Sequence, residues 1–347
     1  MTRVEPFGHT PAGEAATLYT LESGRLRVCI TDYGGRMVSI EAPDRDGRSG
    51  HVLLGFDDVA QYAVNGGSFG ALLGRNANRI GRAELPIDGR TYKLIITDRG
   101  NTLHGGPRGF GMVMWRVVKA DDTELVLTHT SPDGDQGFPG EMAVEARYRL
   151  AAEALSLTLT AQTDKPTDAS LSAHPYFNLA GTAAGDVLSH EVMIAADAFL
   201  PTDATQLATG EIRLVEGTVF DLRQPTVIGS RIRQPEPQLL LAQGFDHFFI
   251  VGSTTVQEPR FVARLRDPGS GRVVEIHTTQ PGLQFYTGNQ LRGAFAGRGE
   301  VAYRQSAGVA FEPQGFLDAA HHANFSTTTL RPGELYRQII EYQFGAA

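Results

Sequence analysis

The stretch Ala154-Leu-Ser-Leu-Thr-Leu-Thr-Ala161 decides the fold class of this chain. Leucines at positions 155, 157 and 159 alternate with serine or threonine at positions 156, 158 and 160. Successive side chains of a β-strand point to opposite faces of a sheet, so this alternation buries one face and exposes the other to water. We therefore predict a β-strand that covers a hydrophobic core on one side.

Similar strand-like runs occur along the whole chain and are separated by turn-forming clusters of Gly, Pro and Asp. Helical periodicity is confined to one or two turns at Asp57–Tyr62 and to Ile228–Gln243, which Pro235 and Pro237 interrupt. Many short strands with almost no helix predict an all-β sandwich or barrel. The other predicted strands are Arg25–Ile30, Tyr92–Ile96, Trp115–Lys119, Glu124–His129, Glu141–Leu150, Phe248–Val251, Arg260–Leu265, Val273–Thr279 and Leu335–Phe344.

Length and composition exclude several classes of protein. The 347 residues contain 41% hydrophobic residues and no linker, repeat or low-complexity segment, so we expect one domain over residues 1–347. A net charge of −8 argues against a nucleic-acid-binding surface. The single cysteine, Cys29, excludes an intrachain disulfide framework. No apolar stretch suits a membrane span or a signal peptide, so we expect a cytoplasmic protein, a monomer or homodimer without a membrane partner.

Two residues before prolines are candidates for proton transfer. His174 precedes Pro175 and lies next to the aromatic Tyr176, and imidazole is suited to acid–base work near neutral pH. Glu312 lies in the run Gly308-Val-Ala-Phe-Glu-Pro313, where a carboxylate is costly to bury unless it is paired or used. Taken alone, each is more often structural, as a hydrogen-bonded histidine or a buried ion pair.

Five further polar residues lie in glycine- or aromatic-rich settings. An amide and a guanidinium in Gly74-Arg-Asn-Ala-Asn-Arg-Ile80 are natural donors to sugar hydroxyls, and a histidine precedes two glycines that allow a close backbone approach. Each residue on its own is again more often structural. The five are Asn78, Arg79, His104, Asp246 and Gln284.

Other catalytic constellations are missing from the sequence. Pro268 takes the place of the first glycine before Gly269-Ser-Gly271, so there is no Gly-x-Ser-x-Gly nucleophile elbow. No lysine follows a glycine, which excludes the Gly-Lys-Ser/Thr phosphate loop. Neither a thiolate cluster nor a His-x-x-x-His pattern is present. We expect no metal and no cofactor.

Taken together, the segments resemble the aldose 1-epimerases, also called galactose mutarotases. The resemblance runs from Tyr33-Gly-Gly35 to Leu330-Arg-Pro-Gly-Glu334. The motifs that carry it are Gly74-Arg75 with Ala77-Asn-Arg-Ile80, Asn101-x-Leu-His-Gly-Gly106, His174-Pro-Tyr-Phe-Asn-Leu179, Phe245-Asp-His247, Gln280-Pro-Gly-x-Gln-Phe-Tyr-Thr-Gly-Asn289 and Glu312-Pro-Gln314.

This resemblance implies a large antiparallel β-sandwich with an open sugar cleft, and an isomerase that interconverts the α and β anomers of free aldoses such as glucose and galactose. Carried over by motif, the catalytic acid is His174 and the catalytic base is Glu312. The implied sugar-binding residues are Asn78, Arg79, His104, Tyr176, Asp246 and Gln284.

Two alternatives stay open. One is a hexose-6-phosphate 1-epimerase of the same fold, for which arginines such as Arg75 or Arg108 would have to meet a phosphate. The other is a noncatalytic sugar-binding β-sandwich.

For the epimerase, we expect nearby carboxylates to raise the pKa of His174, and we assign the basic limb of the pH profile to this histidine.

Overall fold

The alternating stretch at 154–161 lies in the middle of the largest sheet. In the computed structural model, which describes residues 3–65 and 68–347, β14 (Ala154–Thr163) pairs with β13 (Met142–Ala151) on one side and with β28 (Tyr336–Ala346) on the other. Leu155, Leu157 and Leu159 are buried, as predicted. The remaining strands of this nine-stranded antiparallel sheet are β11 (Arg116–Ala120), β12 (Glu124–Ser131), β24 (Arg272–Thr278), β23 (Arg260–Arg266), β18 (Glu191–Ile194) and β21 (Thr226–Val227).

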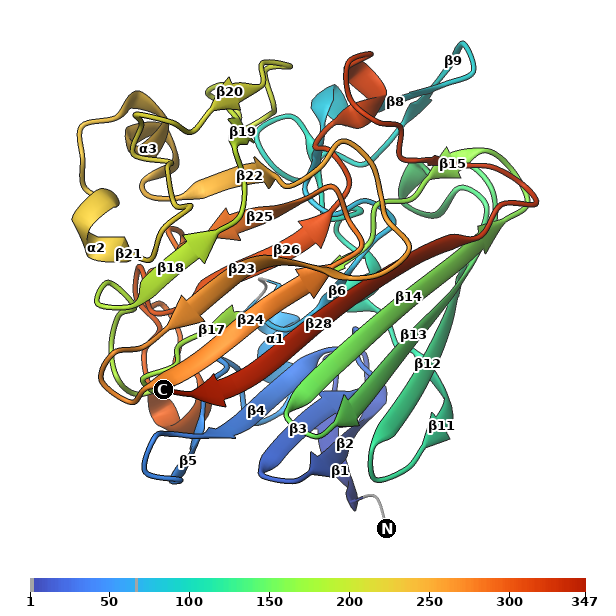
Figure 1. Ribbon diagram of the computed structural model, residues 1–347. Coiled ribbons are helices and arrows are strands. Elements are labelled where there is room, and N and C mark those ends of the chain that lie inside the picture. The colour runs from blue at the N-terminus through green and yellow to red at the C-terminus, as the bar shows by residue number, and fades with distance from the viewer. Residues whose placement is uncertain (1–2, 66–67) are drawn as a thin grey trace.

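A six-stranded antiparallel sheet lies behind the β24–β23–β18 part of the nine-stranded sheet in Figure 1. Phe285 and Phe311 from the six-stranded sheet share one core with Leu155 and Leu157, and this core contains residues from Leu21 to Phe344. The two sheets therefore bury their inner faces against each other, which is the β-sandwich that the sequence predicts. The strands are, in order, β17 (Tyr176–Phe177), β26 (Val309–Gln314), β25 (Gly282–Tyr286), β22 (Asp246–Ile250), β19 (Ala198–Leu200) and β20 (Arg213–Leu214).

The N-terminal part of the chain forms a separate five-stranded antiparallel sheet at the bottom of Figure 1. Its strands are β1 (Arg3–His9), β2 (Ala15–Ser23), β3 (Leu26–Thr31), β4 (Met37–Pro43) and β5 (Ser49–His51). The described residues also form four two-stranded ladders: β6 (Leu72–Leu73) with β16 (Ser172–Ala173), β7 (Arg79–Ile80) with β10 (Thr102–Leu103), β8 (Glu84–Ile87) with β9 (Arg90–Lys93), and β15 (Thr167–Asp168) with β27 (Thr329–Leu330).

The helices of the described residues are short, as the sequence predicts. Helix α1 (Val59–Val64) begins after Asp58, whose side chain accepts a hydrogen bond from the backbone of Gln61 and caps the first turn. The prolines divide the second helical stretch into α2 (Ile228–Arg231) and α3 (Pro237–Ala242). No helix among residues 3–65 and 68–347 is long and apolar enough to cross a membrane.

One strand prediction is wrong in extent. The run Tyr92–Ile96 was expected to be a strand, but β9 ends at Lys93. The backbone N–H of Leu94 still donates to the carbonyl of Ala83, but Ala83 has φ of +51°. The N–H of Ile95 donates to the carbonyl of Gln136 instead, so the β8–β9 ladder goes no further. The apolar residues Ile95 and Ile96 are exposed in a loop, so their hydrophobicity does not report a buried face.

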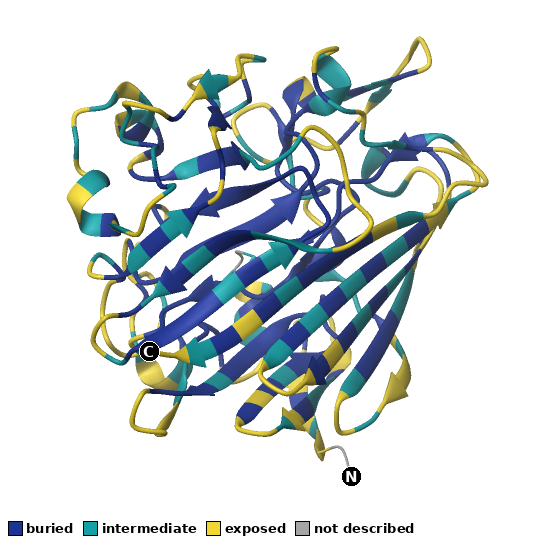
Figure 2. Ribbon diagram, viewed as in Figure 1, coloured by how far each residue is buried: buried dark blue, intermediate teal, exposed yellow. Residues whose placement is uncertain are grey.

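The alternation of side chains gives the six-stranded sheet two different faces. Residues directly opposite each other in an antiparallel pair share a face. Gln284 lies opposite Glu312, and Asp246 lies opposite Tyr286, so these four side chains project from the same face. Phe285 and Phe311 project from the other face into the core. All of strand β26 is buried (Figure 2), although one of its faces carries the polar side chains of Glu312 and Gln314.

Candidate active site

Glu312 projects from the polar face of β26 and is almost inaccessible to solvent, with 3% of its side chain exposed. Its Oε2 atom has no hydrogen-bond partner among the described residues. A buried carboxyl group without a full set of hydrogen bonds is costly for the fold, and such groups concentrate at functional sites. This arrangement supports the view that Glu312 does more than stabilise the sheet.

His174 follows strand β16 and faces Glu312. Its backbone N–H donates to the carbonyl of Ala71, and its carbonyl accepts from the N–H of Gly70. Gly70 has φ of +65°, and a Cβ atom there would lie 2.0 Å from the carbonyl oxygen of Met37, so only glycine fits. These contacts hold the His174 Nε2 atom 3.4 Å from Glu312 Oε1. The imidazole also packs against the ring of Tyr176, with 4.6 Å between centroids.

His104 and Asn78 hold each other through two hydrogen bonds. The backbone N–H of His104 donates to the carbonyl of Asn78 at 3.0 Å, and the backbone N–H of Asn78 donates to Nδ1 of the His104 ring at 3.1 Å. Since Nδ1 accepts a hydrogen bond, the proton of the neutral ring must be on Nε2. Burial lowers the pKa of His104, with His174 and Arg79 acting in the same direction, so the ring stays neutral. His104 thus offers one N–H donor to the cavity.

Arg79 is fixed by three neighbours. Its Nε donates to Asp98 at 2.7 Å, its Nη2 donates to Gln206 at 2.9 Å, and its backbone N–H donates to the side-chain oxygen of Asn78 at 2.9 Å. The last bond occupies the Asn78 oxygen and leaves the amide NH₂ of Asn78 as the donor toward a ligand. The side chain of Arg79 is 11% exposed, so its guanidinium is largely ordered before any ligand binds.

Asp246 and Gln284 form a pair beside Glu312. The amide nitrogen of Gln284 donates to the Asp246 carboxylate at 2.6 Å. Gln284 is 2% exposed and does not contribute to the cavity wall, whereas Asp246 does. Gln284 therefore lies behind Asp246 and orients it.

The cavity between these side chains has a volume of about 250 Å³. Of the eight residues that the sequence analysis selected, it brings together seven, and Gln284 is the exception: Asn78, Arg79, His104, His174, Tyr176, Asp246 and Glu312. Sequence reasoning missed Ser68, Asp98, Arg99, Leu103, Gln206, Tyr286 and Gln290, which also line it. The alternation of side chains along a strand could have predicted Tyr286, because it lies two residues after Gln284 on the same strand and so projects from the same face. Nothing in the sequence around Gln206 distinguishes it from other turn residues.

The charge state of the His174–Glu312 pair differs from the sequence-based expectation. Burial lowers the pKa of His174 to about 3, and nearby Arg36 acts in the same direction. Burial also raises the pKa of Glu312 well above its usual value, with Asp246 adding to the rise and Arg79 opposing it. The expected rise in the pKa of His174 is therefore wrong, because removal from water outweighs the nearby carboxylates.

The donor atoms of His104, His174 and Glu312 lie within 4.8 Å of one another, a grouping that residue spacing in the sequence does not indicate. A metal ion would need the lone pair of His104 Nε2, and that nitrogen carries the proton because Nδ1 accepts from Asn78. The group therefore fits a hydrogen-bonding ligand better than a metal ion.

Comparison with known proteins agrees with this geometry. The aldose 1-epimerase family profile matches residues 17–343. The galactose mutarotase of Bos taurus is 40% identical over 98% of both chains, and the aldose 1-epimerase of Escherichia coli K12 is 34% identical over 96% of both.

Two solved structures show the same fold. A crystal structure of an aldose epimerase homologue from C. elegans has a TM-score of 0.88 at 27% identity, covering 96% of this chain and 100% of the other. The galactose 1-epimerase from Lactobacillus acidophilus has a TM-score of 0.83 at 26% identity, covering 100% and 99%. On the strength of the sequence match across nearly its whole length and of this shared fold, the chain belongs to the aldose 1-epimerase family.

Proposed function

We propose that this protein is an aldose 1-epimerase, an isomerase that interconverts the α and β anomers of free aldoses such as glucose and galactose. The observation that carries the proposal is the buried pair of His174 Nε2 and Glu312 Oε1, 3.4 Å apart in a cavity lined by hydrogen-bonding side chains. The cavity volume of about 250 Å³ lies below the range of about 300–1,000 Å³ typical of pockets for drug-sized ligands, which favours a ligand as small as a single sugar ring.

The reaction requires two proton transfers and the breaking of one bond. Glu312 removes the proton from the C1 hydroxyl, His174 protonates the ring oxygen, and the C1–O5 bond breaks to give the open-chain aldehyde. After rotation about C1–C2, the O5 hydroxyl attacks the other face of the C1 carbonyl while Glu312 and His174 reverse their roles. Throughout the cycle the pair needs no net gain or loss of protons.

The surrounding groups would hold the sugar while its ring opens. Asn78, Arg79 and His104 supply N–H donors, and Asp246 supplies an acceptor that Gln284 orients. Tyr176 presents an aromatic surface beside His174. Sugar hydroxyls both donate and accept, which matches a wall carrying both kinds of group.

The arrangement disfavours a phosphorylated sugar as substrate. Arg75 is buried and donates to Ser131 and Thr167, away from the cavity. Arg108 does not contribute to the cavity wall either. The basic residues that do, Arg79 and Arg99, both lie within 4.0 Å of the Asp98 carboxylate. A phosphate would have to compete with that carboxylate for both of them.

Polarimetry of freshly dissolved α-D-glucose, α-D-galactose and α-D-xylose tests the proposal, with glucose 6-phosphate as the comparison. We expect acceleration with one or more free sugars and little with the phosphate. A protein that binds these sugars without accelerating mutarotation would be the noncatalytic module. Replacing either member of the pair, as Glu312→Gln or His174→Asn, should lower kcat by about 10²–10⁴ with a smaller change in KM. Near-parental turnover in either variant would mean that the role of that residue is misassigned.

We further infer a single domain over residues 1–347, because one core contains residues from both ends of the chain. A cytoplasmic location and a monomeric or homodimeric state remain proposals; the single cysteine supports the first. Gel filtration and cell fractionation test them.

A further inference from the structure

A second, larger cavity lies beside the sugar cavity and shares one segment of chain with it. Tyr286 and Gln290 line the sugar cavity, while their neighbours Asn289, Leu291 and Arg292 line the second one. The second cavity has a volume of about 720 Å³, within the range of about 300–1,000 Å³ that small-molecule sites occupy. We call it the arginine cleft, after Arg233, Arg292 and Arg304 in its wall.

The three guanidinium groups of the arginine cleft have no carboxylate to neutralise them. No Asp or Glu lines the cleft, and in residues 3–65 and 68–347 the single side-chain hydrogen bond of the three arginines runs from Arg292 to the amide oxygen of Gln290 at 3.2 Å. Some exposed arginines elsewhere are paired, as Arg331 is with Asp88. Arg116 and Arg149 on the nine-stranded sheet have no carboxylate partner among the described residues, but they line no shared cavity. In a chain with a net charge of −8, this is a local concentration of uncompensated positive charge.

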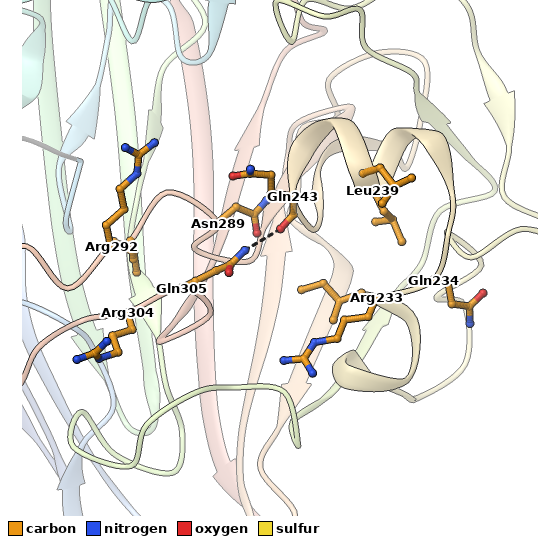
Figure 3. A pocket seen from close by; sticks show the side chains of 11 residues that line it. Arg233, Gln234, Leu239, Gln243, Asn289, Arg292, Arg304 and Gln305 are labelled. Carbon is orange, nitrogen blue, oxygen red and sulfur yellow. Dashed lines mark hydrogen bonds between the residues drawn. The ribbon is translucent and has the colours of Figure 1, made fainter.

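The cleft has two walls and an apolar floor. In Figure 3, Arg233 extends from the side of α2 and α3, while Arg292 and Arg304 lie on the opposite side with Gln243, Asn289 and Gln305 between them. The apolar lining, which we call the floor, consists of the buried side chains Ile232, Leu239 and Leu291 together with the exposed Leu240.

Hydrogen bonds across the cleft keep it in shape. The Gln305 amide donates to the carbonyl of Gln243 at 3.0 Å, the dashed contact in Figure 3. The amide of Asn289 donates to the carbonyls of Ala242 at 2.8 Å and Phe245 at 3.0 Å, which ties the shared segment to the end of α3. These hydrogen bonds therefore join the two walls of the cleft.

We propose that the arginine cleft binds a small phosphate ester, with the phosphate held by Arg233 and Arg304 and the organic part of the ligand against the apolar floor. Guanidinium groups match phosphate oxygens in charge and geometry. An apolar floor below a cationic rim suits a molecule with a phosphate at one end and a carbon skeleton at the other. The ligand occupies a different cavity from the sugar, so the two bind at the same time.

Isothermal titration calorimetry at low salt tests this proposal directly, with inorganic pyrophosphate, ADP and glucose 6-phosphate as probes. The variant Arg233→Ala/Arg304→Ala removes two charges from the cleft. Its matched control, Arg116→Ala/Arg149→Ala, removes two exposed arginines from the nine-stranded sheet. Circular dichroism and the mutarotase assay verify that both variants fold, because none of the four residues lines the sugar cavity.

We expect the cleft variant to bind each probe at least about tenfold more weakly than the wild type, and the control to stay within about twofold. ADP or glucose 6-phosphate should bind more tightly than pyrophosphate, because only an organic ligand reaches the floor. Affinity should be unchanged when galactose saturates the protein. Binding free energies are measured without turnover, so a failure here is distinguishable from a failure of the proposed activity.

Several results would overturn the proposal. Absence of binding to the wild type would do so, and so would an equal loss in the control, which would indicate attraction to surface charge in general. Competition with galactose would place the phosphate in the sugar cavity. Displacement of all three probes by a tighter-binding hexaglutamate peptide would assign the cleft to an acidic protein segment.

Discussion

The pH dependence of mutarotation tests the charge state of the catalytic pair. The proposed chemistry needs one proton shared between His174 and Glu312, either as an ion pair or as two neutral groups. With a pKa of about 3, an isolated His174 would be protonated in roughly one molecule in a thousand at pH 6. Burial therefore favours a resting pair in which the proton resides on Glu312, whose pKa burial raises. That proton must pass to His174 Nε2, 3.4 Å from Glu312 Oε1, before Glu312 can act as the base and His174 as the acid.

This resting state changes which residue is responsible for each limb of the pH profile. As pH falls toward about 3, the neutral His174 gains a second proton for the pair, and activity declines. As pH rises through the raised pKa of Glu312, the pair loses its only proton, and activity declines again. We therefore expect a broad bell for kcat/KM in which Glu312 supplies the basic limb, instead of His174 as the sequence suggested.

The assay is polarimetry of α-D-galactose across pH 3–10, comparing the wild type with the residual activity of His174→Asn. In the variant, the only requirement left is an ionised base, so activity should rise through the pH range in which the wild type falls. The uncatalysed rate in matched buffers is subtracted at each pH. A basic limb that persists unchanged in the variant would refute the reasoning.

Three further predictions follow from the same geometry. Because its pKa is raised, Glu312 keeps its proton in the folded state, whereas the unfolded side chain ionises above about 4.5, so its contribution to stability is present at pH 4 and lost as pH rises. Scanning calorimetry should therefore show that Glu312→Gln raises Tm at pH 8 but not at pH 4. Asp98→Asn should raise KM by about tenfold with less effect on kcat, because Arg79 loses a charged partner. The control Asp88→Asn removes the exposed partner of Arg331 and should leave KM unchanged, so equal changes in the steady-state kinetics of the two variants would contradict this prediction. Dialysis against EDTA should leave polarimetric activity intact, because the Nε2 proton of His104 opposes metal binding, and a loss that a divalent ion restores would reverse that view.

Much of the fold follows from local patterns. The alternation at Leu155, Leu157 and Leu159 specifies a half-buried strand whatever its neighbours are, and Pro237 begins α3 because proline is tolerated in the first turn of a helix. The same logic failed at Ile95 and Ile96. A short apolar run does not reveal whether a partner strand exists to cover it, and here the ladder ends at Lys93.

The sequence by itself determined which chemical groups are available: an imidazole and a carboxyl before prolines, several amide and guanidinium donors, and motifs that identify the family. Only the tertiary structure decided what these groups do to one another. Strand register places Gln284 opposite Glu312 and on the same face as Asp246, to which it donates a hydrogen bond, and the bond from Asn78 selects the tautomer of His104. Removal from water, which depends on every segment that covers the site, moves the pKa values of His174 and Glu312 in opposite directions. Such burial is a property of the packed sheets, so no local pattern in the chain encodes it.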